Sequence, residues 1–106
     1  MHDIEQLRQF NQAENYVVTM HGRRRMSERG ILLADVMNAV DHGEIIEIYP
    51  DDYPFPSCLV LGITVREHYL HAVVSLNEGR IYLITAYFPS PDEWEPDMKT
   101  RRKKNV

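Results

Sequence analysis

The sequence predicts an α+β domain in which N-terminal helices pack on one face of a four-stranded, mainly antiparallel sheet. Apolar residues recur at helical spacing as far as residue 42, and after Gly43 β-branched and aromatic residues follow in short runs separated by turn formers. The length of 106 residues fits one domain, since domains commonly have about 100 to 150 residues. Helices that precede a meandering sheet are typical of the α+β class.

The first two helices have recognisable ends. Asp3 is a suitable N-cap for a short helix that ends near Asn11, with apolar residues at helical spacing. Thr19 is the expected N-cap of a second helix over residues 20–29, and Gly30 is well placed to end it in the left-handed conformation. Between them, residues 16–18 form a brief extended piece.

The third helix carries a continuous apolar stripe and ends before Gly43. It is therefore the helix expected to face the core. The stripe consists of Leu32, Leu33, Val36, Met37 and Val40.

Four strands are expected after Gly43, over residues 44–49, 58–65, 69–76 and 80–88. The segment 50–57 contains three prolines and is predicted to be a loop, because proline cannot donate to a strand ladder. Asn77-Glu78-Gly79 is a strong hairpin signal.

The predicted organisation is one domain over residues 1–98, followed by a basic tail over residues 99–106. No apolar run approaches the roughly 20 residues of a membrane helix, and the N-terminus lacks the features of a signal peptide, so we expect no membrane partner and a cytoplasmic protein. A lone Cys58 excludes an internal disulfide. The histidines at positions 2, 42 and 68 lack metal-ligand spacing, so neither a metal nor a cofactor is expected.

Positive charge is concentrated in two segments, although the net charge of −4 argues against a general nucleic-acid binder. Residues 21–30 carry four arginines against Glu28 alone, and residues 99–104 carry five lysines and arginines. Two interpretations stay open: the basic segments bind phosphate, or they pair with the acidic middle of the chain.

One flank of the second helix groups residues suited to hold an anion. His21, Arg25, Glu28 and Arg29 follow one another at helical spacing. A guanidinium donates to two phosphate oxygens, and an imidazole exchanges a proton near neutral pH. The alternative is a solvated helix face on which Glu28 pairs with the arginines.

A second group lies on the last two strands. If Leu76 pairs with Arg80 across a three-residue loop, His71 lies opposite Thr85 and Tyr69 lies opposite Tyr87, all on one face. Polar groups at the end of an apolar face are typical of the mouth of a site. The alternative is a buried, hydrogen-bonded His71 with no role in chemistry.

At the level of ordered motifs, residues from about 16 to 102 resemble a family known as a domain of unknown function, DUF4258. The motifs that carry the resemblance are MHGRRRMSERGI at 20–31, GEIIEIYP at 43–50, PSCLVLG at 56–62, LHAVV at 70–74 and ITAYFP at 84–89, followed by Trp94 and Arg101.

This resemblance implies a RelE-like or barnase-like toxin architecture, similar to RelE, ParE and MqsR, and a metal-independent RNA endonuclease. RNA or the ribosome is the implied target, and a small zinc-finger antitoxin is the implied protein partner. The alternative is a non-catalytic interaction domain with the same fold.

The resemblance also assigns roles to residues. Such cleavage needs a base, an acid and a cation for the phosphorane. The implied catalytic residues are His21, Arg25, Arg29, His71, Thr85 and Tyr87, with either histidine as base or acid, the two arginines as the charge clamp and Tyr87 as a phenolic donor. The implied nucleic-acid-binding residues are Arg24, Arg101 and Arg102.

Overall fold

The computed structural model describes residues 3–103 and confirms the α+β class. A single-turn 3₁₀ helix, Ala13–Asn15, precedes the first strand. The helices are α1 (Ile4–Gln9), α2 (Met20–Arg29) and α3 (Leu33–His42). The strands are β1 (Tyr16–Val18), β2 (Glu44–Tyr49), β3 (Ser57–Ile63), β4 (Tyr69–Asn77) and β5 (Arg80–Tyr87).

The sheet has five strands in the order β1-β5-β4-β3-β2, so the predicted count of four is wrong. The added strand is β1, which runs parallel to β5 with Tyr16 opposite Ile81 and Val18 opposite Leu83. The other neighbouring pairs are antiparallel, as predicted. A three-residue segment carries too little pattern to reveal a strand, and its pairing partner lies far along the chain.

The predicted helix ends are confirmed for α2. The Thr19 side chain accepts a hydrogen bond from the Gly22 amide at 2.9 Å, and Gly30 adopts a left-handed φ of 68°. α1 is fixed to the end of α3 by Arg8, which donates to the carbonyls of Val40 at 3.0 Å and Gly43 at 2.8 Å. These bonds satisfy acceptors that a helix C-terminus leaves unpaired.

The helices cover one face of the sheet. Their apolar side chains join those of alternate strand residues in a single core, which includes Met26, Val36, Val40, Val60, Ala72, Val74 and Leu83. α2 lies so close to β5 that a Cβ atom on Gly22 would stand 2.9 Å from the Ile84 carbonyl oxygen. Glycine at this position lets the helix approach the strand backbone.

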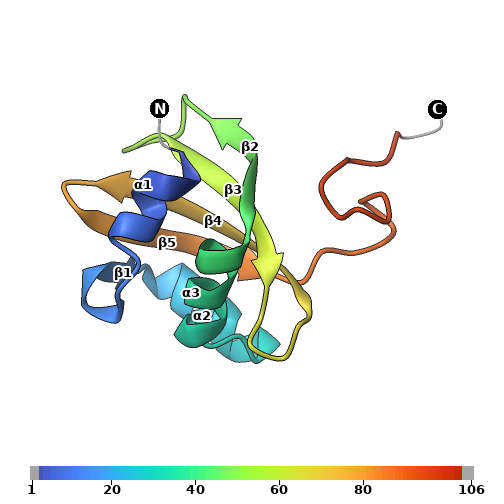
Figure 1. Cartoon of the computed structure of the whole chain (residues 1–106), viewed down its shortest axis with the longest axis horizontal. Helices are drawn as coiled ribbons and strands as arrows, with labels where there is room; N and C mark the ends of the chain where they lie inside the picture. Colours follow the sequence, from blue (N-terminus) through green and yellow to red (C-terminus); the bar gives the residue numbers. More distant parts are fainter. Residues whose placement is uncertain (1–2, 104–106) are drawn as a thin grey trace.

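The opposite face of the sheet is covered in part by the residues that follow β5, which contact His71 and Glu47, and in part by the loop before β3, whose Phe55 packs on Tyr82. Leu59 and His71 on this face are fully buried, and Trp94 from the C-terminal segment (residues 89–103) is 1% exposed. Figure 1 shows this segment, in orange to red, apart from the three helices and beyond β2. The domain therefore has apolar packing on both faces of its sheet.

The β4–β5 hairpin differs in register from the prediction. Asn77 pairs with Arg80 across a two-residue turn, in which Glu78 and Gly79 both have positive φ. This turn matches the twist of a hairpin better than the predicted three-residue loop does. An irregularity between Val73 and Val74 shifts the register again further along.

Candidate nucleic-acid interface

The outer surface of α2 is the most strongly cationic part of the helical layer. Gly22 and Met26 are the buried residues of this helix, so the side chains between them face outward. A shallow hollow on this surface is lined by Met20, His21, Arg23, Arg24 and Ser27, all of which are exposed. We call this set, with the exposed Arg25, the α2 surface.

The charges of the α2 surface are only partly neutralised. The single ion pair formed by α2 within residues 3–103 joins Arg25 to Glu28, at 3.7 Å. Both side chains are about half exposed, so water screens this contact strongly. The hydrogen bonds and ion pairs of the described residues therefore leave Arg23 and Arg24 available to an anionic partner.

His71 lies on the opposite face of the sheet and is fully buried. Its Nε2 is 2.7 Å from the Met98 carbonyl oxygen and its Nδ1 is 3.2 Å from the Tyr87 hydroxyl. Because a carbonyl only accepts, Nε2 carries the proton and Nδ1 accepts from Tyr87. Burial lowers the pKa of His71, which keeps the ring neutral. Both ring nitrogens are thus hydrogen-bonded. This arrangement fits the alternative given above, in which His71 is a buried structural residue with no role in chemistry.

The predicted pairing of His71 with Thr85 is wrong, because His71 pairs with Tyr87 and Thr85 pairs with Val73. The corrected register still leaves His71, Thr85 and Tyr87 on one sheet face. Burial raises the pKa of the Tyr87 hydroxyl. The Tyr87 hydroxyl therefore keeps its proton at neutral pH and donates it in the hydrogen bond to His71, which is a structural role.

The structure does not bring His21 and Arg25 to His71. α2 packs on the core face of the sheet, whereas His71 points to the face covered by the C-terminal segment. The implied catalytic set, in which His21 and Arg25 act together with His71, is therefore not assembled into one site. Arg29 comes nearer to the sheet, since its guanidinium donates to the Ala86 carbonyl at 2.7 Å, but it thereby serves to fix α2 to β5.

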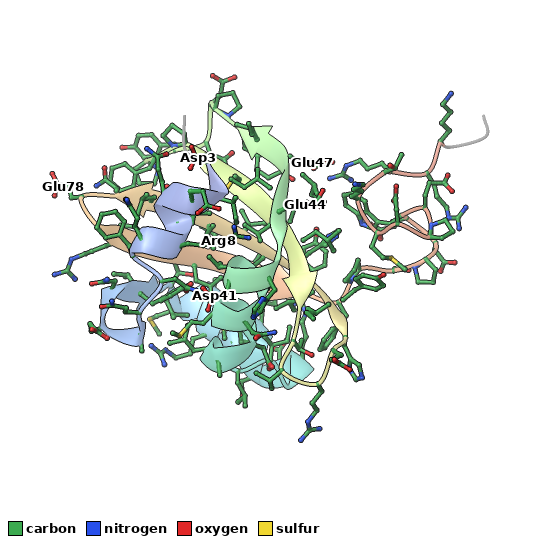
Figure 2. All side chains as sticks on the ribbon, in the orientation of Figure 1. Asp3, Arg8, Asp41, Glu44, Glu47 and Glu78 are labelled. Atoms are coloured by element: carbon green, nitrogen blue, oxygen red, sulfur yellow. The ribbon has the colours of Figure 1, made fainter. Side chains whose placement is uncertain are left out.

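Three cations of the C-terminal segment, Lys99, Arg101 and Arg102, contact acidic groups of the same molecule. Arg101 donates to both carboxylate oxygens of Glu47, at 2.7 and 3.0 Å, and lies 4.6 Å from the centre of the Trp94 ring. Figure 2 labels Glu44 and Glu47 on β2, from which these contacts start. Lys99 lies 3.4 Å from Glu44, so two strand carboxylates hold this segment.

The pKa values of two β2 side chains, Glu47 and Tyr49, are shifted in this region. The hydrogen bonds from Arg101 hold the pKa of Glu47 below its ordinary value. Burial, together with the hydrogen bond that its hydroxyl donates to Glu47 at 2.6 Å, raises the pKa of Tyr49 to about 12. Glu47 thus accepts from two donors and is ionised at neutral pH.

Arg102 is also engaged within the segment. It donates to the Pro91 carbonyl at 2.6 Å and to Glu95 at 3.2 Å. The two arginines assigned to nucleic acid in this part of the chain, Arg101 and Arg102, therefore hold the segment together, whereas Arg24 lies on the open α2 surface. Lys104 lies outside the described residues.

Sequence reasoning missed a cleft at the end of the sheet nearest the C-terminus of α2. It lies between the α2–α3 connection at Gly30 and Leu32, the β3–β4 loop at Arg66 and His68, and Phe88 at the end of β5. Its residues come from three separate parts of the chain, so no local sequence signal indicates it.

No group of three or more His, Cys, Asp or Glu side chains within residues 3–103 is arranged to hold a metal ion. Across the same residues, no helix combines the length and apolar character required to cross a bilayer. Cys58 is buried, and this burial raises the pKa of its thiol to about 11, so it is a poor nucleophile.

Comparisons with curated proteins and with solved structures find no match to this chain. A comparison with protein families matches residues 18–88, more than half of the chain, to a family described as a domain of unknown function. The match extends from the end of β1 through α2 to the residue after β5, and so includes the α2 surface and Phe88. The chain therefore belongs to the DUF4258 family.

Proposed function

We propose that this protein is an RNA-binding interaction domain whose α2 surface contacts the phosphate backbone. The observation that carries the proposal is the difference between the cations of α2 and those of the C-terminal segment. Arg23 and Arg24 are exposed and form no ion pair within residues 3–103, whereas Lys99, Arg101 and Arg102 are paired with carboxylates. The choice of RNA as the ligand rests on the resemblance to ribonuclease toxins.

The negative net charge does not oppose this proposal. The charge is unevenly distributed, because Glu44 and Glu47 pair with Leu61 and Leu59 and so lie on the face of the sheet opposite α2. A local cationic surface attracts phosphates within about a Debye length, near 8 Å at physiological ionic strength, whatever the total charge.

RNA cleavage is a narrower hypothesis that this geometry supports less well. A general base must reach the proton that it removes, and His71 is buried with both nitrogens occupied. Cleavage would therefore need exposed groups, and His21 is the histidine on the α2 surface. The toxin activity and the zinc-finger antitoxin also remain predictions, which rest on the family resemblance alone.

The proposal is tested by fluorescence anisotropy with a labelled single-stranded RNA and the full chain, at several salt concentrations. The logarithm of the association constant should fall linearly with the logarithm of salt concentration, because bound phosphates release counterions. Replacing Arg23 and Arg24 by alanine should weaken binding and reduce the salt slope by roughly 1.4, at about 0.7 for each lost phosphate contact.

The matched control is Arg80→Ala combined with Lys103→Ala, which removes the same charge from exposed positions outside α2. This variant should keep the affinity and slope of the wild type. Equal losses in both double variants, or no salt-dependent binding by the wild type, would contradict the proposal. Circular dichroism checks that both variants are folded.

A further inference from the structure

The cleft beside α2 combines exposed aromatic and apolar side chains with a preformed backbone. Phe88 is 43% exposed, and its ring meets His68 edge to face at 6.4 Å between centroids. Leu32 and Val65, at 63% and 57% exposure, also line the cleft. These side chains are not part of the buried core, so the packing of the fold does not account for them.

The walls of the cleft are held in place by a buried carboxylate. Asp35 is 6% exposed, and its two oxygens accept the amides of Leu32 at 2.9 Å and Val65 at 3.0 Å. One side chain thus ties the α2–α3 connection to the β3–β4 loop. With two N–H donors facing it, its charge is largely compensated within the wall.

The β3–β4 loop is fixed in the same way. The Thr64 hydroxyl accepts the amides of Arg66 and His68, and the Thr64 amide donates to the His68 carbonyl at 2.8 Å. His68, which meets the Phe88 ring, therefore lies on a loop whose backbone is already hydrogen-bonded. A ligand that enters the cleft meets a surface that needs little further ordering.

One cation lines the cleft and a second lies near it in the chain. Arg66 is on its rim, beside the exposed Glu67, and Arg29 binds the carbonyl of Ala86, two residues before Phe88. The cleft also begins at Gly30, where α2 ends. The cleft therefore adjoins the C-terminal end of the helix that carries the α2 surface.

We propose that this cleft is a base-binding subsite, in which Phe88 stacks on an unstacked base of a single-stranded RNA. The inference rests on the proposed function, because the α2 surface supplies the contacts to the phosphates. Aromatic rings bind bases of single strands in this way, whereas bases in a duplex are already stacked on their neighbours. The subsite accordingly makes the domain selective for single-stranded over double-stranded RNA.

The test compares Phe88→Ala with the wild type on one labelled RNA, presented as a single strand, as a duplex and as a single strand with abasic positions. Loss of one stacked base should weaken single-strand binding roughly 5- to 150-fold. The salt slope should stay unchanged, because no phosphate contact is removed. The variant should bind the duplex and the abasic strand as the wild type does.

Tyr53→Ala is the matched control, since Tyr53 is an aromatic residue with 95% exposure in the loop before β3. It should bind single strands like the wild type. Phe88→Trp should retain binding and report it directly, through quenching of the new indole when RNA is added. This variant separates a lost stacking contact from a disturbed loop.

The outcomes distinguish the two proposals. Salt-dependent binding that requires Arg23 and Arg24 but is unchanged by Phe88→Ala, with equal affinity for single strand and duplex, overturns the subsite and leaves the proposed function intact. Absence of salt-dependent binding by the wild type overturns both.

Discussion

The α2 surface and the C-terminal segment both carry clustered arginines, yet the two regions use them differently. In the C-terminal segment Arg101 and Arg102 are hydrogen-bonded to carboxylates and carbonyls of the same molecule. On α2, Arg23 and Arg24 face outward from a helix anchored by Gly22 and Met26. Runs of basic residues therefore do not by themselves identify a binding surface: acidic groups that arrive from elsewhere in the fold decide which cations remain open.

The largest effect that tests this comparison is expected from Trp94→Ala. Trp94 is 1% exposed and packs against His71 at 4.5 Å and Arg101 at 4.6 Å. Removing a buried ring of this size typically lowers the free energy of unfolding by about 3 to 5 kcal/mol. Urea unfolding measures this loss, while the salt slope of RNA binding by the folded protein should be unchanged. A variant as stable as the wild type would show that the C-terminal segment is not a structural region.

A smaller effect is expected from His71→Gln, together with a change in pH dependence. Burial lowers the pKa of His71 below its ordinary value of 6.5 in the folded state, so the unfolded chain binds more protons below that pH. The contribution to stability is fully present above pH 6.5 and is lost as the pH falls through the window beneath it. The variant should lose roughly 1 to 3 kcal/mol at pH 7, because hydrogen-bonding groups are left unsatisfied.

The measurement is urea unfolding at several pH values between 7 and 5. Wild-type stability should decline over this range, and the decline should be shallower in His71→Gln. Equal slopes would contradict the assignment of this pH dependence to His71. The pKa of Glu47 is also lowered, but Glu47 changes the stability only at more acidic pH, below its ordinary pKa of 4.5.

The smallest effect is expected from Arg101→Ala. Its ion pair with Glu47 has good bidentate geometry, but the Arg101 side chain is 57% exposed and the contact is screened by water. Exposed pairs typically contribute about 0 to 1 kcal/mol. Thermal melts should detect a small loss of stability, and RNA affinity should match the wild type. A loss of affinity as large as that from alanine at Arg23 and Arg24 would remove the distinction between the two regions.

Local signals predicted most of the fold. Thr19 and Gly30 marked both ends of α2, because an N-cap and a left-handed glycine act within a few residues. The sheet face of His71 and Tyr87 was also predictable from the alternation of strand residues. The hairpin register was not, since Glu78 adopts a positive φ of 50° that its residue type does not suggest.

The candidate site was less predictable, because its important contacts join distant residues. Nothing near Arg101 in the sequence indicates that Glu47 will bind it, and nothing near Phe88 indicates that Arg66 will lie beside it. The exposed face of α2 could be deduced from helical spacing. Whether the arginines of α2 form ion pairs depends on which face of the sheet carries the acidic residues. That placement is decided by the topology of the fold.

The parallel pairing of β1 with β5 has a consequence for the order in which the molecule assembles. β1 and α2 are synthesised early, but the strand on which both dock is the last of the sheet to be made. A ten-residue helix is marginal on its own, so α2 stays unsupported until β5 has been completed. Closing this long loop is an entropic cost that precedes any gain from packing. The α2 surface is therefore among the last parts of the chain to become ordered, and a nascent chain acquires it only when residues 80–87 have been synthesised.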